Sequence, residues 1–498
     1  MRGSSARFMS SAVVLILLLS IVLLSAAGCK QSLLDPKEPV TLAMWHNYGG
    51  QMKNLMDEMI DEFNSSIGAE QGIIISVTAI SGSSELHDML TAAAEEVPGA
   101  MPLPDITTSY PKTAVILKQH DKLVDLSEHF SKSKLDEYVP AFVDEGRLDD
   151  EGLYVFPIAK STEVLFVNQT LFDRFAAENN IGYEDMATFE GIAAASMTYL
   201  RWTDRQTPDV PGDGKAFFMA DSLFNQALVG SKQLNENFLL VGEGNSDETS
   251  AQLNISSPSY SRIWGINFIP AVCGGIAVFD GYSSDLFKTG DLVCAVGSTA
   301  GVLFYPEVVT YPDNTKEDAS YAILPYPTYV NGKKAALQRG GGMCVIKSEA
   351  AREYASSIFL EWFTRPEQNL RFTLSSGYLP VTKEAFGSLQ ACVSSDTAAS
   401  SGNQDVSVII EDERIRQQLK TILQMYEEYE FFYTPHASNG EVLQRSYEEQ
   451  IISIVTDGRE QVAAAYGQPS YFSIEPAENV GEMSDAAKQS LKEKFGIS

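Results

Sequence analysis

Aromatic and small polar residues recur at three points where an apolar run gives way to a helical pattern. The apolar runs 40–45, 73–80 and 105–109 each end at such side chains. Aromatic faces can cover the C–H groups of a solute, and neutral side chains can pair with its polar atoms. These residue types therefore indicate solute binding by ring contact and hydrogen bonds. The residues at the junctions are Trp45, His46, Tyr48, Ser83, Glu85, Ser109 and Tyr110.

Several of these side chains also have a purely structural interpretation. Trp45 ends a buried strand and is equally suited to a core position, and His46 is suited to a hydrogen bond with the backbone. Ser83 is a good N-cap for the helix that follows it. The sequence leaves both interpretations open at these positions.

The elements around the junctions alternate between strand and helix. A helix carrying Leu86 and Leu90 follows the second run, and Pro111 begins another. Strands separated by single helices form parallel βαβ units in a doubly wound sheet, where ligands bind at the carboxyl ends of the strands. The three junctions are therefore expected at one edge of one sheet.

The first helix has one apolar face, formed by Met52, Leu55, Met56, Met59, Ile60 and Phe63.

A second α/β region begins after an acidic, glycine-punctuated stretch at 144–157. The chain is long enough for two or three domains. Further strands are predicted at 163–168, 292–301, 321–327 and 340–346, and further helices near 351–362, 408–430 and 439–456. The tail after 476 is predicted to be a loose helix or frayed.

Patterns for catalysis or metal binding are weak in this chain. The acidic runs 149–151 and 427–430 fit a hairpin tip and a solvated helix face better than a glycosidase pair. No GxSxG, P-loop, HxH or HExxH pattern occurs. PDVPGDG at 208–214 lacks the twelve-residue calcium-loop pattern. We therefore expect a protein that is not an enzyme and that has no cofactor and no metal.

The charge of the chain is strongly negative. It has 36 basic and 66 acidic residues, a formal net charge of −30. Such a surface repels phosphate backbones and anionic lipid headgroups. Nucleic acid is therefore excluded as a partner, and so is a polybasic membrane contact.

The first 29 residues have the order of a secretory signal. A positively charged start precedes an apolar run at 12–24, and small residues lead to Cys29. A cysteine at this point resembles the lipobox of bacterial lipoproteins, although Ala26 stands where that pattern prefers Leu. We expect removal of residues 1–28, lipidation of Cys29 and a tether at 29–37, which places the protein on the extracytoplasmic face of a cell membrane. A plain signal peptide with an incidental cysteine is the alternative.

Five short motifs follow one another along the chain, covering about residues 38–465. In this order and spacing they resemble the extracellular solute-binding proteins of ABC importers, in the group for sugars, oligosaccharides and glycerol phosphates. The motifs are TLAMWHNYGGQMKNLMDEMIDEFN (41–64), LPDITTSYPKTAVILKQHDKLVDL (103–126), YVFPIAKSTEVLFVNQTLF (154–172), YAILPYP with RGGGMCVIKSEAAREYASSIFLEWF (321–363), and SGYLPVT (376–382).

The resemblance implies an α/β fold of two doubly wound lobes, periplasmic-binding-protein-like and of type II, with the solute in a cleft between the lobes. A hinge of two or three segments joins the lobes. The first crossing is expected near Ile158–Lys160 and the second near Ile323–Pro327. The implied division is 38–157 plus 326–350 for the first lobe, 158–325 plus 351–470 for the second lobe, and 471–498 for the tail.

Positions that match the family's motifs add candidate ligand-binding residues. Lys160 and Arg339 are the only cations near them. The added candidates are Ser161 and Thr162 after the first crossing, Ser298 and Thr299 at a helix start, Gly341 for close backbone approach, Tyr378 where the family uses a tyrosine, and His436 in the segment where glycerol-phosphate binders place an arginine. Trp264 lies in the second region outside these motifs and is a candidate stacking platform, as Trp202 could also be.

The expected function is capture of a sugar or oligosaccharide and its delivery to the transmembrane subunits of an ABC permease, by a monomer. A neutral carbohydrate is favoured because the late segment 431–440 has no arginine for a phosphate. Two alternatives remain: a glycerol phosphate or polyamine-like solute on the same fold, and a surface lipoprotein without a transport role.

Overall fold

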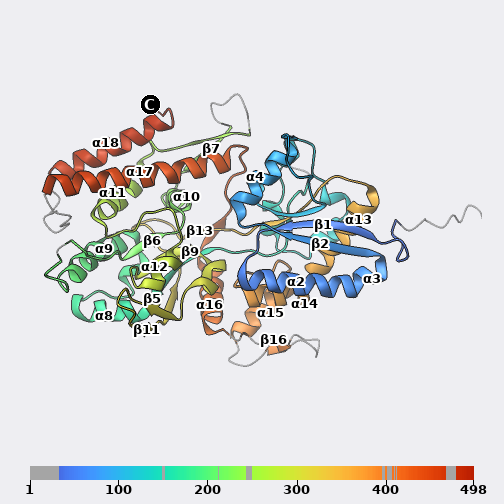
Figure 1. Ribbon diagram of the computed structural model, residues 1–498, viewed down its shortest axis with the longest axis horizontal. Coiled ribbons are helices and arrows are strands. Elements are labelled where there is room, and N and C mark those ends of the chain that lie inside the picture. The colour runs from blue at the N-terminus through green and yellow to red at the C-terminus, as the bar shows by residue number, and fades with distance from the viewer. Residues whose placement is uncertain are drawn as a thin grey trace, which may run out of the picture.

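Two α/β lobes lie side by side along the long axis of the molecule in the computed structural model (Figure 1). The structure describes residues 33–148, 152–210, 212–242, 249–394, 399–400, 407–408, 410, 412–466 and 478–497. The predicted signal peptide and Cys29 lie outside the described residues.

The first lobe is built on the sheet β2-β1-β3-β14-β4. β1, β2 and β3 pair in parallel, as the strand–helix alternation predicts, and β14 runs antiparallel to β3 and β4. Its strands are β1 (Val40–His46), β2 (Ile73–Ala79), β3 (Ile106–Ser109), β4 (Phe156–Pro157) and β14 (Gly342–Val345), and its helices are α2 (Gly50–Ser65), α3 (Ile67–Gln71), α4 (Ser83–Ala94), α5 (Pro111–Gln119), α6 (Lys132–Leu135), α7 (Pro140–Glu145), α13 (Ala350–Phe363) and α14 (Pro366–Ser376).

Both faces of the first sheet are buried. Leu42 and Met44 belong to the cluster that contains the apolar faces of α2 and α13. Trp45 belongs to a separate cluster, with Leu90 of α4 and Leu117 of α5. β1 is therefore a central strand that supports helices on two sides.

The second lobe is built on the mixed sheet β12-β5-β9-β6, in which β5 runs antiparallel to both neighbours. The strands of this lobe are β5 (Glu163–Asn168), β6 (Phe218–Ala220), β7 (Leu239–Val241), β8 (Ala251–Leu253), β9 (Cys294–Ser298), β10 (Val308–Thr310), β11 (Lys316–Asp318), β12 (Tyr321–Leu324), β13 (Ala335–Leu337) and β17 (Glu430–Phe432), and its helices are α8 (Gln169–Asn179), α9 (Phe189–Asp204), α10 (Leu223–Gln233), α11 (Pro258–Cys273), α12 (Ser283–Thr289), α15 (Lys383–Ser394), α16 (Glu413–Glu428), α17 (Gly440–Tyr466) and α18 (Glu478–Lys494).

Three short segments cross between the lobes, at about 158–163, 338–341 and 377–382. The backbones of Lys160 and Leu379 exchange two hydrogen bonds, and so do those of Ser161 and Arg339. Gly340 has φ +97°, and a Cβ there would lie 2.7 Å from the carbonyl oxygen of Ala159, so this position requires glycine. The three segments form one hinge.

The structure corrects the crossing predicted at Ile323–Pro327 and the boundary near 351. Residues 321–324 form the edge strand β12, and Tyr326 lies in the core of the second lobe. Phe359 of α13 and Phe372 of α14 lie in the core of the first lobe, on which these helices pack. Apolar periodicity identifies the first of these helices, but it does not say which of two cores receives it.

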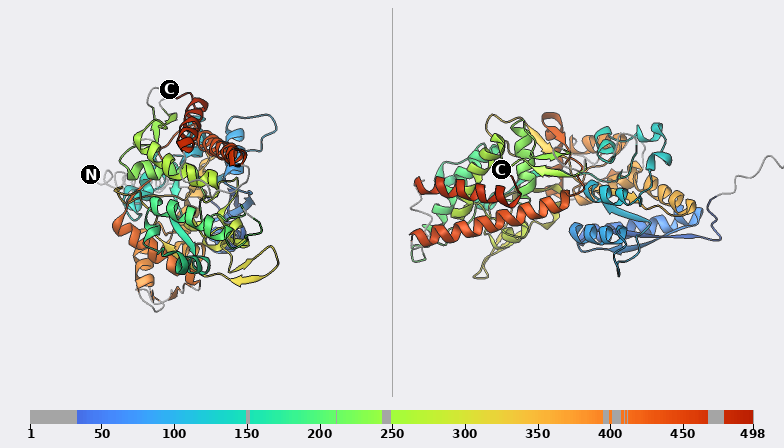
Figure 2. Two further views of the ribbon diagram at one scale, coloured as in Figure 1. Left: turned by 90° about the vertical axis from the view of Figure 1, so that its left-hand side faces the viewer. Right: turned by 90° about the horizontal axis from the view of Figure 1, so that it is seen from above.

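The predicted loose tail contains a packed helix. Leu491 of α18 is fully buried, and Trp264 of α11 donates a hydrogen bond to the Ser484 backbone. Seen from above, α18 lies alongside α17 (Figure 2). No helix within the described ranges has both the length and the apolar character needed to cross a bilayer.

Candidate functional site

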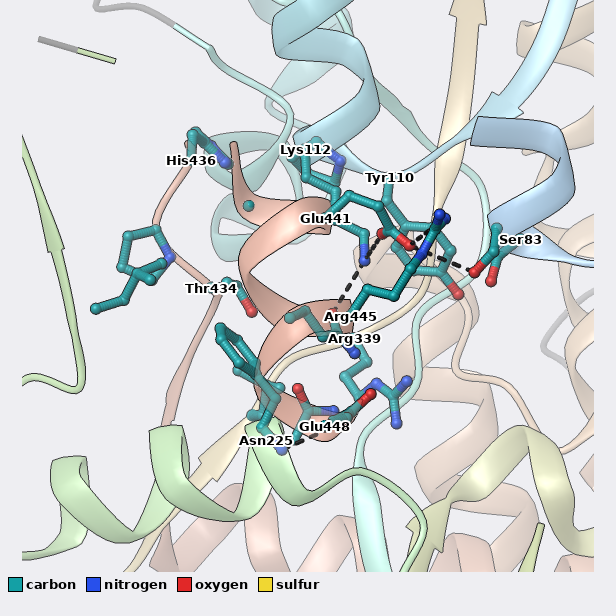
Figure 3. A pocket seen from close by; sticks show the side chains of 18 of the residues that line it. Ser83, Tyr110, Lys112, Asn225, Arg339, Thr434, His436, Glu441, Arg445 and Glu448 are labelled. Atoms are coloured by element: carbon teal, nitrogen blue, oxygen red, sulfur yellow. Dashed lines mark hydrogen bonds and ion pairs between the residues drawn. The ribbon is translucent and has the colours of Figure 1, made fainter. Parts of the chain in front are cut away.

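Two adjoining cavities, of about 710 and 540 Å³, lie between the lobes. Ser83, Tyr110 and Arg339 line both of them, and we call these three residues the waist. Figure 3 shows the larger cavity, with the waist residues among side chains of α17. Each cavity falls in the size range of small-molecule sites, about 300–1,000 Å³.

The first lobe forms its wall from the three strand–helix junctions that the sequence singles out. Tyr48 follows β1, Ser83 begins α4, Ser109 ends β3, and Tyr110 lies between β3 and α5. Gly341 completes this wall, and a Cβ there would lie 2.9 Å from the Ser109 carbonyl oxygen. Parallel pairing of β1, β2 and β3 brings these junctions to one edge of the sheet.

The second lobe presents its own strand ends to the smaller cavity. Asp221 follows β6, and Ser298 ends β9, where its hydroxyl accepts a hydrogen bond from the Ala300 N–H. Tyr282 and Phe304 add exposed rings, 71% and 54% accessible. Tyr378 comes from the third hinge segment. The smaller cavity therefore has aromatic and hydroxyl side chains on both walls.

Seven of the candidate side chains do not line either cavity. Trp45 packs in the apolar core between the sheet and α4 and α5. His46 is fully buried, and its Nδ1 accepts a hydrogen bond from the Tyr48 N–H. Burial lowers the pKa of His46 to about 4. Glu85 is exposed and lies outside the cavities. Trp264 of α11 is buried against α10 and α17.

Ser161, Thr162 and Thr299 are structural residues of the hinge region. Thr162 donates its hydroxyl hydrogen to the Leu337 carbonyl oxygen at 2.8 Å, and its N–H donates to Thr299 Oγ1 at 3.3 Å. Ser161 pairs through its backbone with Arg339. These residues therefore fix the crossing segments rather than face the cavities.

The cations near the cleft are already paired with carboxylates. Arg339 Nη1 donates to Glu163 Oε1 at 2.7 Å. Lys160 is buried and pairs with Glu145 at 2.8 Å, and Lys112 pairs with Glu441. Their charges are therefore largely neutralised before a solute enters.

Burial keeps the phenol groups of the cavities neutral. It raises the pKa values of Tyr48, Tyr110 and Tyr378, because the phenolate would lose hydration there. Each hydroxyl is therefore both a donor and an acceptor at physiological pH. His436 also lines the larger cavity, and burial lowers its pKa below the ordinary value.

The structure adds cavity residues that the sequence-based prediction did not include. Asp221, Asn225, Tyr282 and Glu448 line the cavities from the second lobe. The strand-end rule could have found Asp221, but β6 is only three residues long. No sequence pattern distinguishes Glu448 as a cavity residue. It lies near the start of the long helix α17. Within the described ranges, no group of three or more His, Cys, Asp or Glu is arranged to hold a metal ion.

Comparisons with solved structures show the same fold along nearly the whole chain. The cyclic alpha-maltosyl-1,6-maltose binding protein from Arthrobacter globiformis is 18% identical, with a TM-score of 0.61 over 92% of this chain and 99% of that one. UgpB from Mycobacterium tuberculosis, solved with glycerophosphocholine, is 16% identical, with a TM-score of 0.62 over 91% and 98%. MalE3 of T. maritima, solved with maltose, is 13% identical, with a TM-score of 0.59 over 91% and 99%. These likenesses confirm the predicted fold class.

A comparison with curated proteins finds no match. The model of the family described as bacterial extracellular solute-binding protein matches residues 58–399. This range contains four of the five motifs in full. It also contains the strand–helix junctions that follow β2 and β3. The chain therefore belongs to the bacterial extracellular solute-binding protein family.

Proposed function

We propose that this protein is the substrate-binding component of an ABC importer and that it takes up a sugar or oligosaccharide in the cleft between its lobes. The observation that carries the proposal is the pair of adjoining cavities between the lobes, the smaller of which is walled by rings and neutral hydroxyls from both lobes. A sugar presents C–H faces to rings and hydroxyls to neutral donors and acceptors. Three of the similar solved structures bind or hold a sugar or a glycerophosphodiester, which is consistent with this solute class.

A phosphate-bearing solute is less suited to this cleft. A buried phosphate needs arginine or several charge-assisted donors. Arg339 is bound to Glu163, and Lys112 is bound to Glu441. Asp221 and Glu448 would add repulsion. These contacts support a solute without negative charge.

The remaining parts of the proposal concern the setting of the protein. Membership in the family implies an extracytoplasmic location. We further propose that Cys29 carries lipid, that the protein acts as a monomer without enzymatic activity, and that the closed lobes dock on the transmembrane subunits of a permease.

A thermal-shift screen of the mature protein tests the proposed solute. The pools are neutral mono- and oligosaccharides, glycerol phosphates with glycerophosphodiesters, and polyamines. Binding to the native state raises the unfolding midpoint. We expect a rise with a carbohydrate pool. A rise with the phosphate pool alone would contradict the proposed solute, and no rise with any pool would contradict a transport role.

A further inference from the structure

More negative than positive charge surrounds the waist between the two cavities. Arg339 pairs with Glu163, and Asn225 Nδ2 also donates to Glu163 Oε1 at 2.8 Å. Asp221 and Glu448 lie within electrostatic range of the same guanidinium. We call Glu163, Asp221 and Glu448 the waist carboxylates. All three carboxylates lie near Arg339, and Lys112, which also acts on Glu448, is already paired with Glu441.

Neither Asp221 nor Glu448 forms an ion pair with a basic side chain of the described ranges. Asp221 Oδ1 accepts from the Ser283 N–H at 2.9 Å. Glu448 Oε1 accepts from the Ser222 hydroxyl at 2.6 Å. In Figure 3 the Glu448 side chain lies beside Asn225 and the Arg339 guanidinium. Both carboxylates therefore accept hydrogen bonds from neutral donors, and neither is in direct contact with a cation of the described ranges.

Glu163 adds a buried carboxylate oxygen without a hydrogen-bond donor beside Arg339. It is 2% exposed, and its carboxylate is directed at Arg339 on the waist. Its Oε2 is buried and has no hydrogen-bond partner among the described residues. Burial raises the pKa values of Glu163, Asp221 and Glu448, as expected where charge is short of compensation. A buried charge without enough partners is costly to the empty protein.

The position of the waist carboxylates links them to the path of a solute. Asp221 lines the smaller cavity, Glu448 lines the larger one, and Arg339 lines both. A solute long enough to extend from one cavity into the other passes these groups. The rings of Tyr48, Tyr282 and Tyr378 stand only in the smaller cavity.

We propose that the solute is a carbohydrate with a protonated amino group, its sugar ring in the smaller cavity and its ammonium at the waist against Asp221 and Glu448. This inference rests on the proposed function and narrows it. At the waist the carboxylates outnumber the cations. An ammonium supplies positive charge and N–H donors to them. A polyamine would also pair with the carboxylates. However, it has no sugar ring to pack against the aromatic side chains of the smaller cavity.

Titration calorimetry of the mature protein at pH 7.0 tests this inference with matched pairs of oligosaccharides. Each pair consists of a neutral gluco-, galacto- or manno-oligosaccharide and its 6-amino-6-deoxy counterpart, whose amine is protonated at this pH. We expect the amino member of at least one pair to bind at least tenfold more tightly. Asp221→Asn and Glu448→Gln should each reduce that ratio severalfold. Glu460→Gln, at an exposed position of α17 that lines neither cavity, is the matched control and should leave the ratio unchanged.

Each outcome supports or overturns the inference. Binding of neutral sugars without a preference for any amino member would overturn it and leave the proposed function intact. An equal loss of preference in Glu460→Gln would overturn the assignment to the waist carboxylates. Spermidine binding as tightly as the amino sugars would overturn the role of the sugar ring. Absence of binding by every sugar would contradict the proposed function itself and this inference with it. Thermal unfolding of each variant checks that it is folded.

Discussion

At the scale of single residues, the site combines half-buried phenols with unusually exposed rings. Tyr282 is 71% exposed and Phe304 54% exposed, and both face the smaller cavity from the second lobe. An exposed ring contributes little to folding, whereas a solute that covers it gains apolar contact. These two side chains are therefore available to a solute.

Replacing Tyr282 should separate binding from stability. We expect Tyr282→Ala to weaken solute binding about tenfold, because a ring contact is worth about 0.5–1.5 kcal/mol beyond its buried area. The free energy of unfolding should change by less than about 0.5 kcal/mol, as for most surface substitutions. Calorimetry and denaturant titration measure the two quantities. Tyr354→Ala is the matched control, because Tyr354 is 42% exposed on α13 and lines neither cavity.

His46 should make stability depend on pH without affecting the cavities. Its pKa is about 4 in the folded protein against 6.5 for the ordinary group, because burial disfavours the imidazolium. Below pH 6.5 the unfolded chain therefore binds more protons at this site than the native protein. Stability from the neutral imidazole should be lost as the pH falls from about 6.5 to about 4, by about 3 kcal/mol in total.

Denaturant unfolding between pH 7.5 and 4.5 measures this effect. His46→Gln should show a shallower fall of unfolding free energy than the natural protein. His120→Gln, at an exposed position, serves as the control and should follow the natural protein. Parallel curves for all three proteins would show that His46 does not titrate in this way.

The sequence predicted the location of the first-lobe wall better than the direction of its side chains. The strand-end rule identified Tyr48, Ser109 and Tyr110, which line the cavities. It also selected Trp45 and His46, which are still within β1 and point into the protein. Since consecutive strand residues alternate in direction, an uncertainty of one residue at a strand end changes core into cavity.

At the scale of elements, the start of α17 connects the two lobes across the cleft. Lys112 of α5 pairs with Glu441 and donates to Gln444 Oε1 at 3.0 Å. Arg445 pairs with Asp88 of α4 at 3.2 Å. Glu441 is only 8% exposed, so this ion pair is largely sheltered from water. We call these contacts the interlobe latch.

Removing the latch should favour separation of the lobes. Glu441→Gln removes a sheltered ion pair of about 1 kcal/mol, which corresponds to about fivefold weaker solute binding. Small-angle scattering without solute should show a larger radius of gyration. Glu361→Gln is the control, because Glu361 pairs with Lys134 within the first lobe. Equal radii and affinities for both variants would mean that the latch does not hold the lobes together.

The element pattern could be predicted further than its division into lobes. The apolar face of α2 is confirmed, with Met52, Met56 and Phe63 buried. The sequence did not assign α13 and α14 to the first lobe, because an apolar helix face carries no record of its partner. The crossing at 338–341 escaped prediction for a related reason. It is defined by backbone pairing with Ser161, far away in the sequence.

At the scale of the whole molecule, two separate cores meet at a hinge and leave the solute cavities between them. One core surrounds the five-stranded sheet, and the larger one surrounds the four-stranded sheet. The hinge is narrow, with three segments joined by backbone hydrogen bonds. This division allows each lobe to move as a unit while the walls of the cleft change their separation.

The most direct test of the account is a crystal structure of the protein with the carbohydrate that raises its unfolding midpoint most. We expect density for the sugar between the lobes, in contact with Tyr110 and Tyr378 and within reach of Asp221. We also expect the cleft to be closed around the sugar. Density for the sugar on an outer face of either lobe, with both cavities filled only by water, would contradict the central claim.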